Sequence, residues 1–113
     1  MRLFAVLLSV ALIAAALSCS GSSRPDLHPF AVEICGQLRS DSPLGYQVPG
    51  GKPNAPQYLI DGLEGAQTFA DTMDPQHFHL VTIREYSDAL DSVCPQTVRR
   101  FLGGQSYYDW LTD

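Results

Sequence analysis

The chain has 113 residues, of which 45% are hydrophobic, and its mean hydropathy is close to zero at -0.02. Much of the apolar material lies in the first twenty residues. An export segment of about 18 residues would leave roughly 95, which suffice for one small domain but not for a multidomain enzyme, a repeat array or a polytopic membrane protein. The net charge of -5 becomes -6 without Arg2, with six Lys+Arg against twelve Asp+Glu. An acidic chain without basic clusters argues against nucleic acid or an anionic membrane surface as a partner.

Residues 1–18 have the layout of a secretory signal peptide. Arg2 supplies the positive start, about fifteen uncharged residues follow, and small residues mark the cleavage zone. The apolar run is shorter than the ~20 residues that a membrane-spanning helix needs, and no positive cluster follows it. We therefore expect this segment to direct export and to be removed.

The residues that end at Cys19 resemble a bacterial lipoprotein box, in which the cysteine is lipidated and becomes the first mature residue. Ser18 suits the position before the cysteine, whereas that family usually has Leu at the position of Ala16 and a small residue at the position of Leu17. Residues 19–26 are rich in Ser, Gly and Pro and are expected to form a flexible tether. Simple secretion after cleavage at a neighbouring position is the alternative.

Three cysteines are an awkward number for an exported protein, because one thiol is left over. If Cys19 is lipidated or removed, Cys35 and Cys94 form an even pair in an oxidising compartment. A bond between them closes a loop of about 60 residues, which contributes roughly 4 kcal/mol if the effect is chain entropy. Two separately buried free thiols are the alternative. The chain contains no CxxC and no Cys/His spacing typical of zinc sites.

Apolar residues four apart predict a first helix over residues 27–39, with Asp26 as its cap and Pro29 in its first turn. Cys35 lies beside the apolar stripe and is expected to face the core. Residues 40–56 follow with four prolines and three glycines, which exclude a continuous helix or a central strand. A loop of this length in a small domain is often functional, although a tolerated surface excursion explains it equally well.

A second helix is predicted over residues 57–73, where apolar residues recur at helical spacing. These residues are Leu59, Leu63, Ala66, Ala70 and Met73. Gly62 and Gly65 each cost this helix up to ~1 kcal/mol relative to alanine. The helix therefore needs packing to stabilise it, or the small residues permit a close helix crossing.

Residues 76–83 are ambiguous between strand and helix. Their Val, Thr and Ile residues favour a strand, whose alternation would place Phe78, Leu80 and Thr82 on one side. Asp74–Pro75 is, however, also a helix-start signature.

The apolar spacing over residues 83–102 is helical. Pro95 interrupts it, which predicts a kink or two abutting helices, and Gly103–Gly104 supplies the stop. The ending then places four aromatic or apolar side chains in five residues, namely Tyr107, Tyr108, Trp110 and Leu111. A polar disordered tail would not have this composition. The segment either folds back to complete the core or presents a partner-binding surface, since Tyr and Trp are enriched at binding hot spots.

Together these elements predict a mainly α fold. Residues 27–113 would form a single small domain of three to four short helices, joined by one Cys35–Cys94 disulfide and carrying the long Pro/Gly-rich loop. An α+β fold with a short hairpin from residues 46–48 and 77–82 is the alternative.

Few residues are arranged for chemistry. His77 and His79 would share one face of a strand and are weak candidates for a metal pair, but a site needs three or four ligands. The chain has no GxSxG, no HExxH and no Gly-rich phosphate loop. Asp88 and Asp91 fit a solvated helix face. We therefore expect a non-catalytic protein without a cofactor.

The segments AVEICGQLRS (31–40) and YSDALDSVCPQ (86–96) resemble a family of small exported actinobacterial domains of unknown function. That family is helical, has two cysteines and places the second one directly before a proline, as Cys35, Cys94 and Pro95 do here. The 58 residues between these cysteines exceed the family's usual interval. The resemblance implies export, helices and a disulfide, but no activity.

The leading functional hypothesis is an exported, lipid-tethered, non-catalytic cell-envelope protein that binds an unknown protein or envelope component. Its contact surfaces would be residues 40–56 and the aromatic ending, and it would touch the membrane only through a lipid on Cys19. A small metal- or ligand-binding domain that uses His77 and His79 is the second hypothesis. A secreted peptide or toxin-like factor is the third, although such scaffolds usually have more disulfides.

Overall fold

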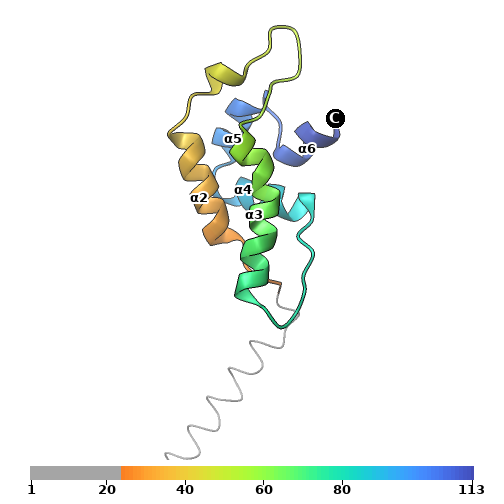
Figure 1. The fold of residues 1–113 in the computed structure, drawn as a ribbon. Helices are drawn as coiled ribbons and strands as arrows, with labels where there is room; N and C mark the ends of the chain where they lie inside the picture. The colour runs from red at the N-terminus through yellow and green to blue at the C-terminus, as the bar shows by residue number, and fades with distance from the viewer. Residues whose placement is uncertain (1–23) are drawn as a thin grey trace, which may run out of the picture.

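The computed structural model describes residues 24–113. The predicted signal peptide (1–18) and Cys19 therefore lie outside the described residues. Over 24–113 the chain forms five α-helices and one short 3-10 helix, without any strand (Figure 1). The elements are α2 His28–Arg39, η1 Pro43–Tyr46, α3 Gln57–Met73, α4 Ile83–Val93, α5 Pro95–Phe101 and α6 Tyr107–Thr112.

The mainly α prediction is confirmed, and the hairpin alternative is wrong for the part of the chain that is described. The described residues form five helices where three to four were predicted: the division at Pro95 into α4 and α5 is one of the two predicted outcomes there, and the ending adds α6. Among residues 24–113, no helix is long and apolar enough to cross a membrane.

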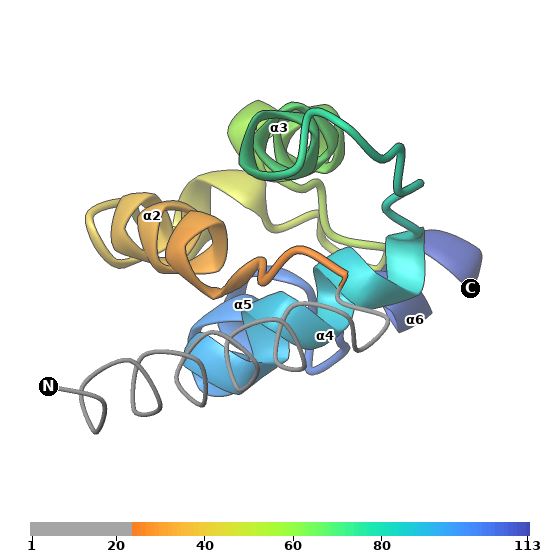
Figure 2. The same ribbon diagram turned by 90° about the horizontal axis from the view of Figure 1, so that it is seen from below.

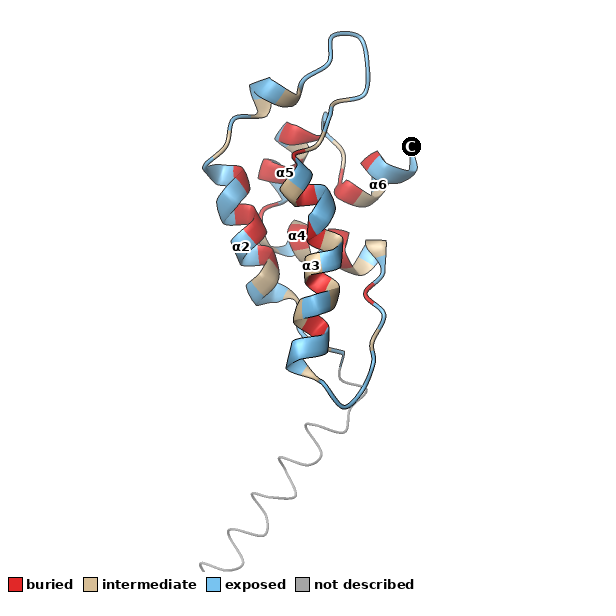
Figure 3. Cartoon of the chain, viewed as in Figure 1, coloured by how far each residue is buried: buried red, intermediate tan, exposed pale blue. Residues whose placement is uncertain are grey.

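Three helices surround a common interior. Seen from below in Figure 2, α2, α3 and α4 lie around the core, and α5 and α6 continue the layer of α4. All five helices contribute buried residues (Figure 3), and the hydrophobic ones form one core cluster. The largest fully buried side chains are Leu38, Leu59, Tyr86, Leu90, Phe101, Leu102 and Tyr107.

The predicted cysteine pair joins α2 to the junction of α4 and α5. Cys35 and Cys94 are both buried, their Cα atoms are 6.0 Å apart, and they form a disulfide. The bond connects residues 59 positions apart in sequence, so it removes many conformations from the unfolded chain.

Helix α2 begins one residue later than predicted. Leu27 occupies the cap position without a side-chain hydrogen bond. Asp26 lies just outside the helix, where its carboxylate accepts a hydrogen bond from the His28 N–H at 3.0 Å. The predicted cap role of Asp26 is thus wrong in position, whereas Pro29 does lie in the first turn.

Two glycines let α3 approach its neighbours closely, as one of the sequence interpretations suggested. A Cβ atom on Gly62 would lie 2.0 Å from the Tyr86 hydroxyl, and one on Gly65 would lie 2.7 Å from the Phe30 ring. The Tyr86 hydroxyl passes Gly62 to donate a hydrogen bond to the Leu59 carbonyl at 2.6 Å. The tyrosine is buried, and burial raises its pKa.

Met73, predicted to belong to the apolar stripe of α3, is exposed. It is the last residue of the helix, beyond the buried residues Leu59, Ala66 and Ala70 that face α2 and α4. Helical spacing identifies a face but not where along that face the neighbouring helices end, so this expectation is wrong.

Residues 76–82 form neither the strand nor the helix that the sequence suggested. Helix α4 starts at Ile83 instead, after a complete capping box between Thr82 and Glu85. The predicted alternation nevertheless exists without a strand, because Phe78, Leu80 and Thr82 are exposed while Val81 is buried.

Candidate interaction surface

The aromatic ending folds back onto the domain as α6. Tyr107 and Trp110 are core residues, with 2% and 8% of their surface exposed. Tyr108 is half-buried and Leu111 is exposed. Of the four residues proposed for partner contact, only these last two present much surface, and we propose no partner contact for the two core rings.

Helix α6 is positioned by polar groups on α4 and at its own start. The Ser106 hydroxyl accepts a hydrogen bond from the Asp109 N–H and caps the helix. The buried Ser87 hydroxyl accepts another from the Tyr108 N–H at 3.0 Å. The Tyr107 ring also packs edge-on against Tyr86, with ring centroids 5.2 Å apart. This arrangement fixes which side of α6 faces the solvent.

The long loop lies against this ending. The Trp110 indole N–H donates a hydrogen bond to the Pro53 carbonyl at 2.9 Å, and the Lys52 ammonium lies 4.7 Å from the centre of the same ring. Gly103, with a positive φ of 68°, leaves room for the Pro53 ring, since a Cβ there would lie 3.1 Å from it. Residues 47–55 and α6 are therefore neighbours, and we call them together the loop–tail face.

The start of the loop is fixed by one carboxylate. Asp41 accepts hydrogen bonds from the hydroxyls of Tyr46 at 2.8 Å and Tyr58 at 2.9 Å. These bonds, with one from the Ser42 N–H, hold the pKa of Asp41 below its usual range. Burial and the neighbouring Asp41 charge raise the pKa of Tyr58. The loop therefore leaves α2 in a defined direction.

The solvent side of the loop–tail face carries a mixture of apolar, aromatic and charged groups. Val48 and Leu111 are exposed, and Lys52 extends over Trp110. Arg84 of α4 lies 4.0 Å from the centre of the Tyr108 ring. Cations placed over aromatic rings contribute about 0.5–1 kcal/mol at exposed sites, so these side chains are partly ordered before any partner binds.

The two candidate metal ligands share a carboxylate. Nδ1 of His77 lies 3.1 Å from one oxygen of Asp74, and Nε2 of His79 lies 3.0 Å from the other. These contacts lower the pKa of Asp74. No group of three or more His, Cys, Asp or Glu residues within 24–113 is arranged to hold a metal ion. The cluster closes the turn that follows α3.

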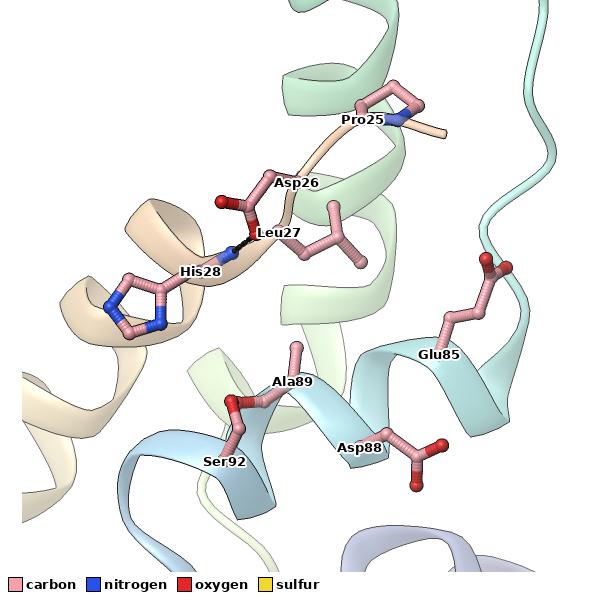
Figure 4. Close-up of a pocket in the computed structure, with 8 residues that line it drawn as sticks. All are labelled: Pro25, Asp26, Leu27, His28, Glu85, Asp88, Ala89 and Ser92. Atoms are coloured by element: carbon pink, nitrogen blue, oxygen red, sulfur yellow. Dashed lines mark hydrogen bonds between the residues drawn. The ribbon is translucent and has the colours of Figure 1, made fainter. Parts of the chain in front are cut away.

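A shallow groove of about 340 Å³ runs between the entry to α2 and helix α4 (Figure 4). Its acidic groups do not converge, because the side chains of Glu85 and Asp88 point away from each other. Glu85 pairs with Arg24 and with its own capping box, and Asp26 accepts from the His28 N–H. The groove therefore offers no assembled ligand set.

Sequence reasoning missed the contact between the start of the described chain and α4. Arg24 forms an ion pair with Glu85 and donates a hydrogen bond to the Leu80 carbonyl at 2.6 Å. The sequence could have predicted the role of Glu85 at the start of α4, because Thr82-Ile-Arg-Glu85 is a capping-box pattern. The partner Arg24, 61 positions away, leaves no local signal.

Comparisons of the chain with protein-family models, with curated proteins and with solved structures found no match.

Proposed function

We propose that the protein is an exported, lipid-tethered, non-catalytic binding protein of the cell envelope. The tether would be a lipid on Cys19, and a protein or envelope component would bind the loop–tail face. The observation that supports this proposal most directly is the bond from Trp110 to the Pro53 carbonyl. It joins the Pro/Gly-rich loop and the aromatic ending, the two segments with the most unusual composition, into one surface.

Several reactive groups elsewhere in residues 24–113 are engaged in the fold, which supports binding rather than catalysis. The thiols of Cys35 and Cys94 are joined in a disulfide. Asp41 accepts from two tyrosines, and Asp74 contacts two histidines. Each of these groups has a structural task and lies outside the loop–tail face.

Site-specific photocrosslinking in the producing cells tests the contact surface. A benzophenone side chain would be placed at Leu111, at Val48, or at Val32 on α2 as the control, since all three are exposed residues. We expect discrete adducts from positions 111 and 48 and none from 32. Equal adducts from all three positions, or adducts from Val32 alone, would contradict the assignment of the surface.

The tether is tested separately by fractionation. Cys19→Ser is expected to move the protein from the membrane fraction to a soluble fraction, because a lipid chain cannot be attached to serine in this way. A protein that is soluble before the substitution, or one that still carries a lipid after it, would show that Cys19 is not the attachment point. The crosslinking result does not depend on this outcome.

A further inference from the structure

Three large apolar side chains are exposed at the end of α3 and in the connection that follows it. Met73 ends α3, and Phe78 and Leu80 lie in the connection to α4; their exposed fractions are 61%, 74% and 61%. Single exposed apolar residues are common on proteins. Three within eight positions, in a connection that also places Val81 in the core, require a closer explanation.

The outward orientation of Leu80 is built into the backbone of this connection. The Gln67 side chain of α3 donates a hydrogen bond to the His79 carbonyl and accepts one from the Val81 N–H, both at 2.8 Å. It thus binds the backbone on both sides of Leu80. Because neighbouring side chains of an extended segment point in opposite directions, burial of Val81 turns Leu80 towards the solvent.

The same connection marks where the N-terminal segment joins the domain. Arg24, the first described residue, donates to the Leu80 carbonyl at 2.6 Å and pairs with Glu85. In Figure 1 the described chain starts at the lower end of the domain, beside the connection between α3 and α4. A lipid on Cys19 would be five residues from Arg24, so it would bring this end of the domain next to the membrane.

The charges around these side chains are largely paired. Arg24 contacts Glu85, and Asp74 lies between His77 and His79, while Asp71 on α3 is exposed. Apart from Arg24, no lysine or arginine occurs between residues 71 and 82 or in the described entry segment. Attraction to anionic headgroups is therefore weak, and apolar contact is the interaction that this end can make.

We propose that Met73, Phe78 and Leu80, here called the proximal apolar patch, insert into the interface of the phospholipid bilayer that carries the lipid tether. This proposal rests on the proposed tether and adds an orientation to it. The tether supplies proximity, and the patch fixes which end of the domain faces the lipid. The loop and η1, which lie at the opposite end in Figure 1, would then face away from the membrane.

Tryptophan quenching by brominated lipid tests the patch directly. The mature protein, as isolated from producing cells, would be bound to phosphatidylcholine vesicles with brominated acyl chains. Phe78→Trp is compared with Leu44→Trp, because Leu44 is also apolar and 82% exposed but lies in η1. The native Trp110 is present in both variants and supplies the common background signal.

We expect the emission added by Phe78→Trp to shift to the blue and to be quenched, and that added by Leu44→Trp to remain unquenched. Leu80→Ser combined with Phe78→Trp should weaken the quenching at least several-fold, because a large apolar group is removed from the interface. No quenching at position 78 in a protein that is acylated and vesicle-bound would overturn the proposal and leave the tether standing.

Two further outcomes separate the possible causes. If the isolated protein has no lipid, vesicles in excess still test the patch, and quenching at 78 but not at 44 would support insertion without a tether. Complete absence of quenching at position 78 under these conditions would overturn the proposal that the patch inserts into the bilayer. Quenching that appears only with phosphatidylglycerol and disappears at high salt would also overturn it, because the proposed contact is apolar and not ionic.

Discussion

The two irregular connections of this domain both expose apolar side chains, but they are held to the helices by different groups. The connection over residues 40–56 is long and rich in proline and glycine, yet it is fixed at its base by Asp41 and farther along by Trp110. The connection over residues 74–82 is shorter and contains better strand-forming residues, yet it leaves Phe78 and Leu80 exposed.

The two connections differ in the hydrogen-bonding groups that the neighbouring helices present to them. The long loop meets hydroxyl and indole donors from α3 and α6, which bind it through its carboxylate and carbonyl groups. The short connection meets the Gln67 amide, whose hydrogen bonds to this connection involve only its backbone groups, so Phe78 and Leu80 stay exposed. Both connections are fixed, so the exposed apolar groups at the lower end are a feature of the folded state.

The largest effect is expected from the residue that joins the long loop to the core. Trp110→Ala should lower the free energy of unfolding by about 3–5 kcal/mol, because it opens a cavity and leaves the Pro53 carbonyl without its donor. Chemical denaturation followed by far-UV circular dichroism measures this loss. Leu111→Ala, at the exposed neighbouring position, is the control and should change stability by no more than about 0.5 kcal/mol. Equal effects would place Trp110 outside the core.

An intermediate effect is expected where the short connection is bound. Gln67→Ala should cost about 1–3 kcal/mol, because the buried Val81 N–H loses its acceptor. Hydrogen exchange at the Val81 amide should also become faster in this variant, because the amide no longer has its hydrogen-bond acceptor. Gln57→Ala removes only a contact to Asp61 within α3 and serves as the control. Unchanged protection at Val81 would mean that Gln67 does not determine the orientation of Leu80.

The base of the long loop predicts a dependence on pH. Hydrogen bonds from Tyr46, Ser42 and Tyr58 lower the pKa of Asp41 in the folded state. The stability that this carboxylate contributes is therefore present above its unfolded pKa and is lost as the pH falls through the lowered folded pKa. Asp41→Asn should be less stable than the parent protein at neutral pH, and the difference should shrink in acid. A difference that is constant with pH would contradict the network.

The smallest effect is expected at the exposed end. Phe78→Ser should change the free energy of unfolding by no more than about 0.5 kcal/mol, because the ring contributes little to the core. Tyr46→Ser, in the other connection, should cost more, since Tyr46 bonds to Asp41 and packs against Phe101. Similar losses in thermal melts of the two variants would remove the contrast between the connections.

Local sequence signals were sufficient for much of the helical framework. The spacing of apolar residues predicted α3 at its observed bounds and α2 to within one residue. Pro95 predicted a kink or two abutting helices, and the structure has the second, α4 and α5. Cysteine parity predicted the Cys35–Cys94 bond. These features depend on periodicity, on the missing proline N–H and on simple pairing, all of which can be read along the chain.

The remaining features depend on contacts between distant residues. Neither the bond from Trp110 to Pro53 nor that from Arg24 to Leu80 has a local signature, because the partners are more than fifty positions apart. Residues 76–82 contain strand-forming residues, but the described part of the chain has no second strand with which they could pair. The Gln67 amide instead makes hydrogen bonds to their backbone of the kind that a neighbouring strand would make. The lipid on Cys19, the binding partner and the family resemblance remain predictions.

We propose that this domain is held at a membrane through Cys19. The most direct measurement is the intact mass of the protein under non-reducing conditions, taken from membrane and culture-medium fractions. We predict a membrane species that starts at Cys19, carries a diacylglyceryl group and lacks two hydrogens because Cys35 and Cys94 are joined. A species without lipid in the medium, cut at another position, would contradict the tether and make the protein a freely diffusing factor.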